Sequence, residues 1–288
     1  MQKLFKGKTM IKHQPHAFPL EVRVENTNQC NASCVICPRE KMTRPKGFMS
    51  LDLFRRIVDE CTNHHIKEMH LQGFGEPFLD KHLFDRIRYA KKRNIGSTVL
   101  VTNGSLLTED TCEKIVRSGL DRMKISFYGT EKAEYEAVHK GIKYEKVKGN
   151  IQQLLLIKKR LKSHTPKVTL KYIGHLHLFP RFVFQWWPKT RVSYARLHNW
   201  CYGRKYNKIS DYRDRKCDMI WDPIFQILWD GRVVPCCYDF DGRLILGDLN
   251  QQSISEIWNG EKYEKLRHAH ATNQLDQYPL CKICDKLR

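Results

Sequence analysis

The hydrophobic and polar positions along the chain follow two alternating periods. Short runs with strand-like alternation are followed by longer segments whose apolar residues recur at helical spacing. Strands are expected at 21–27, 68–73, 97–104, 122–129, 167–174 and 191–197, and helices at 51–64, 81–94, 108–119 and 144–162. This alternation predicts an α/β protein with a parallel sheet and right-handed crossovers.

The number of βα units limits the architecture. Six units are too few to close an eight-stranded barrel, so we expect a partial, TIM-like (β/α)6 barrel. Beyond it, residues 224–240 predict a hairpin around Asp230-Gly231, and residues 253–270 are expected to be helical in parts. The expected organisation is an N-terminal extension (1–19), the partial barrel (20–198), a polar linker (199–216) and a small C-terminal domain (217–288).

Composition adds a strong positive charge to this picture. The 288 residues are 41% apolar, enough for a large core, and carry a net charge of +20. Such a field attracts nucleic acid, anionic membranes, or phosphorylated and acidic substrates. The excess is spread without a long basic block, so solvated helix faces explain it equally well. No apolar run is long enough for a membrane span and the N-terminal residues lack a signal-peptide core, so we expect a cytoplasmic protein.

Three cysteines follow the first predicted strand in the segment CNASCVICPRE. Cys30, Cys34 and Cys37 form a CxxxCxxC pattern, and clustered thiols in the cytoplasm indicate metal binding or catalysis. Structural zinc needs four ligands, which His13 or His16 could complete. An iron–sulfur cube held by three thiolates instead leaves one iron free for a substrate or cofactor.

Two further motifs lie where parallel strands end, which is where functional residues gather. GFGEP (73–77) follows the second strand and TNG (102–104) ends the third. With CxxxCxxC they resemble the radical S-adenosylmethionine (SAM) superfamily, although Phe74 stands where the family usually has Gly. The resemblance implies a 4Fe-4S cluster on Cys30, Cys34 and Cys37 that binds SAM. The implied SAM contacts are Gly73, Gly75, Glu76, Pro77, Asn103, Ser126 and Lys140.

The C-terminal cysteines resemble the abbreviated SPASM region, called a twitch domain, of some radical SAM enzymes. The resemblance implies a second, auxiliary 4Fe-4S cluster held by Cys217, Cys236, Cys281 and Cys284. A zinc site is the alternative, since four cysteines suit zinc as well. Cys237 could replace Cys236 as a ligand, although it should point the opposite way on a regular strand. For Cys201 and Cys237, packing is the simpler interpretation.

The resemblance also implies an activity. Reductive cleavage of SAM would give a 5′-deoxyadenosyl radical that removes a hydrogen atom, and a fully ligated second cluster could accept an electron. This favours oxidation of a sugar or other small, possibly anionic alcohol, as in aminoglycoside-pathway dehydrogenases, with flavodoxin or ferredoxin as electron donor. The catalytic base is not identifiable.

Three alternatives stay open. A peptide-modifying maturase is disfavoured because only about twenty residues precede the first strand. A sugar epimerase would use a thiol such as Cys201 or Cys237 to return a hydrogen atom. An RNA-modifying or RNA-binding protein would use the charge and the aromatic segment 182–189 to stack bases, but we do not expect nucleic acid as a partner.

Overall fold

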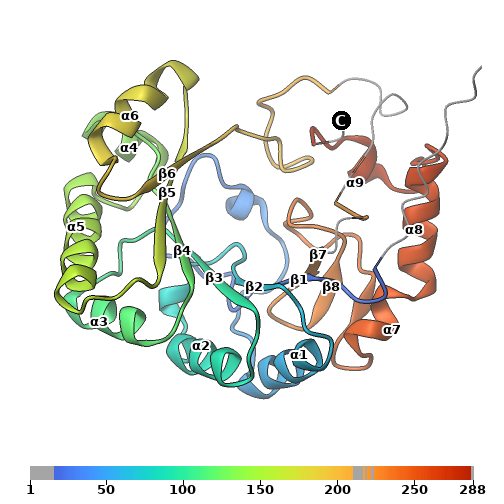
Figure 1. Ribbon diagram of the computed structural model, residues 1–288. Helices are drawn as coiled ribbons and strands as arrows, with labels where there is room; N and C mark the ends of the chain where they lie inside the picture. Colours follow the sequence, from blue (N-terminus) through green and yellow to red (C-terminus); the bar gives the residue numbers. More distant parts are fainter. Residues whose placement is uncertain (1–15, 210–216, 218, 222–223, 287–288) are drawn as a thin grey trace, which may run out of the picture.

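The computed structural model describes residues 16–209, 217, 219–221 and 224–286 (Figure 1). His13, most of the N-terminal extension, residues 210–216 of the linker, residues 218 and 222–223 before the expected hairpin, and the last two residues lie outside the described residues.

The six expected parallel strands are present and adjacent in the sheet. They are β1 (Glu21–Val24), β2 (Glu68–Leu71), β3 (Ser97–Thr102), β4 (Arg122–Ser126), β5 (Lys167–Ile173) and β6 (Arg191–Ala195). Their order is β6-β5-β4-β3-β2-β1, with every neighbouring pair parallel. Most strands are shorter than the ranges expected from the sequence, because the chain turns at their carboxyl ends into the loops that carry the cysteine, GFGEP and TNG motifs. The prediction of a partial α/β barrel is confirmed.

The predicted helices cover the outer face of this sheet (Figure 1). They are α1 (Leu51–Asn63), α2 (Leu83–Lys92), α3 (Glu109–Arg117) and α5 (Tyr144–Arg160). Ser50 caps α1, since its hydroxyl accepts a hydrogen bond from the Leu53 amide at 3.1 Å. Two helices that the sequence analysis did not predict are α4 (Lys132–Val138) and α6 (Phe179–Trp186). In α6, Trp186 is buried, whereas the following Trp187 is 60% exposed.

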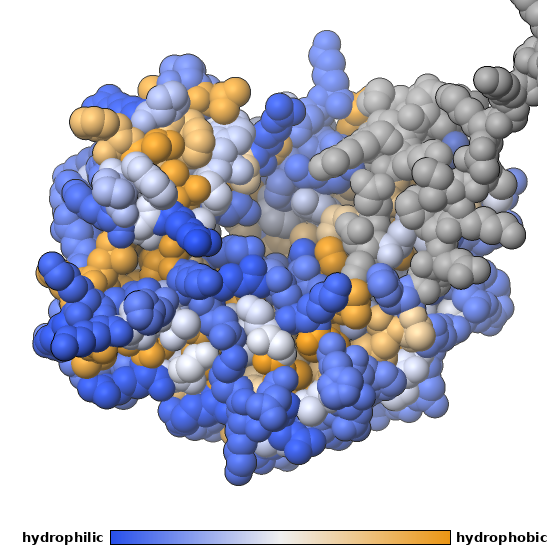
Figure 2. All heavy atoms as spheres, in the orientation of Figure 1, coloured by the Kyte–Doolittle hydropathy of each residue, from blue (hydrophilic) through white to orange (hydrophobic). Residues whose placement is uncertain are grey.

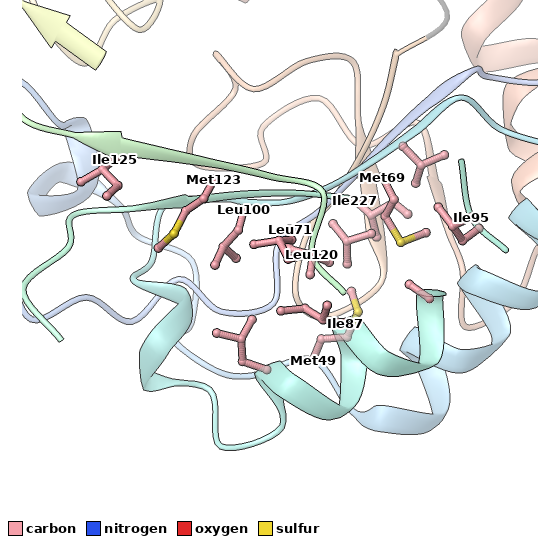
Figure 3. Packing of buried hydrophobic residues seen from close by; sticks show 14 of the residues in the cluster. Met49, Met69, Leu71, Ile87, Ile95, Leu100, Leu120, Met123, Ile125 and Ile227 are labelled. Atoms are coloured by element: carbon pink, nitrogen blue, oxygen red, sulfur yellow. The ribbon is translucent and has the colours of Figure 1, made fainter. Parts of the chain in front are cut away.

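The apolar core lies between the sheet and these helices. Figure 3 shows Met69, Leu71 and Leu100 of the strands facing Ile87 of α2. Their strand neighbours point the other way: in β1, Val22 is fully buried on the helix side, whereas Arg23 lines the barrel interior. The period of two therefore gives the sheet an apolar outer face and a polar inner face.

The C-terminal hairpin is confirmed, but its first strand belongs to the barrel sheet. β7 (Ile224–Ile227) pairs in parallel with β1, β8 (Arg232–Val234) pairs antiparallel with β7, and β9 (Gly247–Asp248) follows. Gly231 supplies the turn with φ of +94°. The result is one nine-stranded sheet, in which β7 covers the β1 edge that would otherwise be open. The sequence-based domain limits stay a proposal.

The segment 253–270, expected to be helical in parts, contains two helices. α7 (Ile254–Trp258) and α8 (Glu261–Ala271) are separated at Gly260, whose extended backbone precedes α8, and α9 (Pro279–Lys282) is the last described helix. Among the helices that the structure describes, none combines the length and apolar character needed to cross a bilayer.

Candidate active site

A cavity of about 390 Å³ lies inside the partial barrel, and we call it the central cavity. The inner faces of β1 to β5 and β7, together with the loops after them, line it. Figure 2 shows the molecule hollowed near its centre, with polar residues around the opening.

Cys30, Cys34 and Cys37 all line the central cavity, each partly exposed. Backbone hydrogen bonds fix their loop, since the Ser33 amide donates to the Lys140 carbonyl and the Cys37 amide to the Cys34 carbonyl, both at 3.0 Å. The loop after β1 is therefore held in one conformation by the end of α4 and by its own turn.

Burial in the cavity wall raises the pKa of all three thiols and so favours their protonated form. Burial, then repulsion from Cys37 and Cys30, raises the pKa of Cys34 to about 12. Burial likewise raises the pKa of Cys37 to about 11 and that of Cys30 above its usual value. Metal binding must displace these protons, and thiolate–metal bonds provide the free energy to do so.

A histidine that the sequence analysis did not single out contacts this set. His139 Nδ1 lies 3.2 Å from Cys34 Sγ. Burial lowers the pKa of His139 to about 4, so its imidazole is neutral. The Tyr128 amide donates to Nε2 at 3.4 Å, which places the imidazole proton on Nδ1, where it is donated to the sulfur.

The donor set fits an iron–sulfur cube better than a single zinc ion. A tetrahedral ion with Zn–S bonds of about 2.3 Å holds its sulfurs roughly 3.8 Å apart. Among the described residues, the one group of three or more Cys, His, Asp or Glu ligand atoms within 4.8 Å of one another is Glu21, Glu68 and His70. The three sulfurs are therefore spread more widely than one zinc ion allows, as ligands of separate irons would be.

The GFGEP segment forms the cavity wall beside the cysteines. Glu76 is 1% exposed and its carboxylate accepts hydrogen bonds from the Thr102 hydroxyl at 2.7 Å and the Asn103 amide at 2.8 Å. A Cβ on Gly75 would lie 2.3 Å from the Thr27 carbonyl oxygen, so this position requires glycine. Glu76 thus ties the loop after β2 to the end of β3.

The structure brings most of the predicted SAM contacts to the same cavity. Its lining includes Gly73, Gly75, Glu76, Asn103 and Ser126. Pro77 is buried as the first residue of a short 3-10 helix (Pro77–Leu79). Lys140 does not join them: its side chain is exposed and lies outside the central cavity, and its backbone carbonyl holds the cysteine loop instead.

Sequence reasoning missed several cations that do line the cavity. Arg23, Lys124 and Lys171 project inward from β1, β4 and β5. The signal was present, because each occupies a polar position in an alternating strand. Arg196 lines the cavity after β6, where the sequence analysis assigned no role.

A second cavity of about 240 Å³, which we call the thiol cavity, lies beside the first. Its lining includes all four expected auxiliary ligands, Cys217, Cys236, Cys281 and Cys284. It also includes Cys201, whose pKa is raised by a hydrogen bond with Cys284 and by burial. Cys201 is therefore a packing residue, as expected, but it packs beside the four expected auxiliary ligands and not in the barrel core.

The two adjacent cysteines of the hairpin face different cavities. Cys236 lines the thiol cavity, whereas Cys237 lines the central cavity alone, with its Sγ 3.5 Å from Arg23 Nη1. This geometry favours Cys236 as the ligand. Cys236, Tyr238 and Asp239 line both cavities, so this short segment is the wall between them.

Comparison with known proteins agrees with this arrangement. The sequence model of the radical SAM superfamily matches residues 24–168, and that of the iron–sulfur cluster-binding domain SPASM matches residues 217–285. The chain is 25% identical, over 91% of its length and 86% of the relative, to the tungsten-containing aldehyde ferredoxin oxidoreductase cofactor-modifying protein of Pyrococcus furiosus. It is 22% identical to the SAM-dependent 2-deoxy-scyllo-inosamine dehydrogenase of Niallia circulans, over 92% of both chains.

Solved structures show the same fold. The crystal structure of BtrN in complex with AdoMet and 2-DOIA has a TM-score of 0.70 and 20% identity, covering 95% of both chains. Streptococcus suis SuiB bound to the precursor peptide SuiA has a TM-score of 0.72 and 14% identity, covering 89% of this chain and 68% of SuiB. The family matches, with three cysteines and the GFGEP segment around one barrel cavity, establish that this chain belongs to the radical SAM superfamily and carries a C-terminal SPASM-type iron–sulfur cluster-binding domain.

Proposed function

We propose that this protein is a radical SAM oxidoreductase that dehydrogenates an alcohol of a sugar or other small molecule. The observation that carries the proposal is the shared wall, in which Cys236, Tyr238 and Asp239 separate the central cavity from the thiol cavity. A substrate in the central cavity would lie between the two sets of cysteines. An electron would then have a short path from the substrate to the second set.

Each set of residues has a proposed role. Cys30, Cys34 and Cys37 would hold the first cluster, and Cys217, Cys236, Cys281 and Cys284 the second. When bound, the first cluster and SAM would supply the chemistry that removes a hydrogen atom from the substrate carbon, and the second cluster would supply an acceptor for the one electron that remains once the hydroxyl proton is lost and the alcohol is oxidised to a ketone. The loop segment of Gly73, Gly75 and Glu76 would orient SAM, with Asn103 and Ser126 on the facing strands.

The chain's own contribution is orientation and the exclusion of water, because a carbon radical would otherwise be quenched. An aromatic wall lies over the loop after β2: the Phe74 ring packs 5.3 Å from Trp200 and 6.1 Å from Phe240. Trp200 Nε1 donates to the Ile36 carbonyl at 2.9 Å, which ties this wall to the cysteine loop. Phe74, at the position where the family usually has Gly, thus serves to close the cavity.

The relatives support oxidation of a small molecule over modification of a peptide. The Niallia circulans relative is named a SAM-dependent dehydrogenase and matches this chain almost end to end. The likeness to the peptide-bound SuiB, at 14% identity, concerns the fold alone. Flavodoxin or ferredoxin would supply the electron for SAM cleavage.

Deuterium transfer tests the proposal. Anaerobically reconstituted protein is incubated with SAM, a reductant and cyclitols or sugars deuterated at each carbinol carbon. We expect one deuterium in 5′-deoxyadenosine and one ketone per 5′-deoxyadenosine with the true substrate class. Deuterium transfer followed by an epimer instead of a ketone, or transfer from a peptide and not from any alcohol, would contradict it.

A further inference from the structure

The floor of the central cavity carries positive charge without matching negative charge. Arg23, Lys124 and Lys171 line it from three strands, and we call them the floor cations. Arg23 pairs with Glu21 at 2.5 Å. Within residues 16–209, 217, 219–221 and 224–286, neither Lys124 nor Lys171 has a hydrogen-bond or ion-pair partner for its ammonium group.

The carboxylates near the floor are already engaged. Glu21 accepts from Arg23, and Glu68 pairs with Arg122 at 2.5 Å and with His70 Nε2 at 2.9 Å. Burial lowers the pKa of His70, so its imidazole stays neutral. Two carboxylates therefore face four cationic groups, Arg23, Arg122, Lys124 and Lys171.

Carboxylates elsewhere on the cavity wall are engaged as well. Glu25 is bound by the Arg44 guanidinium through two hydrogen bonds of 2.7 Å. Asp239 accepts from the backbone amides of Arg243 and Leu244 at 2.9 and 2.8 Å.

Burial and nearby cations act together on the two lysines. Burial and the charge of Arg122 lower the pKa of Lys124, and burial and the charge of Lys124 lower that of Lys171. An unpaired cation in a cavity raises the free energy of the folded protein, and an anion that binds beside it offsets this increase. The floor is therefore arranged to receive negative charge.

We propose that Lys124 and Lys171, with Arg23 beside them, bind an oxyanion of the substrate, a phosphate or a carboxylate. The substrate class is then an anionic alcohol. This identification of the substrate rests on the oxidation proposed above, whereas the anion site stands on the floor cations alone.

The carboxylate of SAM is the competing occupant. Lys171 is the register partner of Ser126, a predicted SAM contact, while Lys124 lies one inward position deeper along β4, beside Val101. The two lysines thus extend from the level of the predicted cofactor site to the floor below it. The two occupants would meet the lysines at different depths, and the test must separate them.

Anion binding to the reconstituted full chain tests the site. Orthophosphate and acetate are titrated calorimetrically at saturating SAM into the wild type and the variants Lys124→Met and Lys171→Met. Lys146→Met, an exposed lysine on α5, is the control with the same loss of charge. We expect binding by the wild type and the control, and about tenfold or greater weakening in each floor variant. Tighter phosphate indicates a phosphate ester, and tighter acetate a carboxylate.

A second measurement guards against misfolding. Because each floor variant removes a cation without a partner, its melting temperature should equal or exceed that of the wild type, and phosphate should raise the wild-type value more than the variants' values. The proposal is overturned if neither anion binds the wild type, or if the floor variants lose affinity for SAM and keep it for phosphate.

The two proposals can fail separately. Oxidation of an uncharged alcohol, with deuterium transfer and no binding of either phosphate or acetate, would contradict the anion site and leave the oxidoreductase proposal standing. Phosphate binding that depends on Lys124 and Lys171, without oxidation of any alcohol, would support the anion site and remove the proposed reaction.

Discussion

At the scale of single residues, Glu76 and the three cysteines after β1 form one part of the central cavity wall. Glu76 and the cysteines are recognisable from motif spacing alone. Lys140 was predicted to reach SAM, yet its side chain is exposed, and Lys124 and Lys171 line the cavity instead. Lys140 follows a helix end whose direction depends on tertiary packing, whereas the strand period fixes the inward direction of the other two.

The adjacent cysteines allow a matched comparison. Cys236 lines the thiol cavity and Cys237 does not, so Cys236→Ala should lower the iron content of reconstituted protein from about eight to about four. Cys237→Ala should leave the iron content unchanged. Iron analysis and electron paramagnetic resonance measure both; the reverse pattern would make Cys237 the ligand.

Burial of Glu76 predicts a pH dependence of stability. Burial raises its pKa to about 7, above its value in the unfolded chain, so the protonated form favours folding. This contribution is complete below the unfolded pKa and is lost as pH rises through 7. Between pH 5 and 7 the free energy of unfolding should fall by about 1.4 kcal/mol per pH unit relative to Glu76→Gln.

Urea unfolding of the iron-free chain at pH 5, 6 and 7 measures this difference. The Gln variant changes the hydrogen bonds to Thr102 and Asn103 equally at every pH. The comparison therefore concerns only the slope of the free energy of unfolding against pH. Parallel slopes for the two proteins would show that Glu76 titrates near its ordinary value.

At the scale of elements, hydrophobic periodicity predicts the six parallel strands and four covering helices, because each has one buried face. It missed α4 and α6 because α4 is short and buries only Tyr135, and α6 is rich in aromatic residues. It indicates the helical parts of 253–270, which are α7 and α8 on either side of Gly260.

The loop after β2 predicts a contrast between two glycines. A Cβ on Gly75 would lie 2.3 Å from the Thr27 oxygen and 2.6 Å from the Gln29 oxygen, both backbone atoms. Gly75→Ala should therefore destabilise the protein by about 1–3 kcal/mol and weaken SAM binding. Gly149, within α5, has no atom within 4 Å of its added Cβ, so Gly149→Ala should stabilise by about 0.5–1 kcal/mol. Thermal unfolding compares them, and equal effects would contradict the close packing at Gly75.

At the scale of the whole molecule, the sequence predicts a barrel followed by a small C-terminal domain, and in the structure β7 pairs with β1 and continues the barrel sheet. No pattern in the sequence reveals this pairing, because edge-to-edge contact depends on backbone groups rather than side-chain periodicity. The Arg44 guanidinium spans the same junction. It forms a buried ion pair with Glu25 and also donates to the Phe240 carbonyl at 2.9 Å.

Truncation tests this junction. Removing residues 199–288 would expose the β1 edge and the apolar surface that β7 covers, so the remaining barrel should aggregate or unfold. Size-exclusion chromatography of the truncated chain measures the outcome. A soluble, monomeric barrel that still binds SAM would show that residues 20–198 form an independent domain.

The central claim is that the cysteines after β1 serve SAM cleavage while the C-terminal cysteines hold a separate cluster. The most direct measurement is 5′-deoxyadenosine formation, with iron content, in the Cys30→Ala/Cys34→Ala/Cys37→Ala protein. We predict no 5′-deoxyadenosine and about four retained irons. Continued release of 5′-deoxyadenosine by this variant would contradict the account.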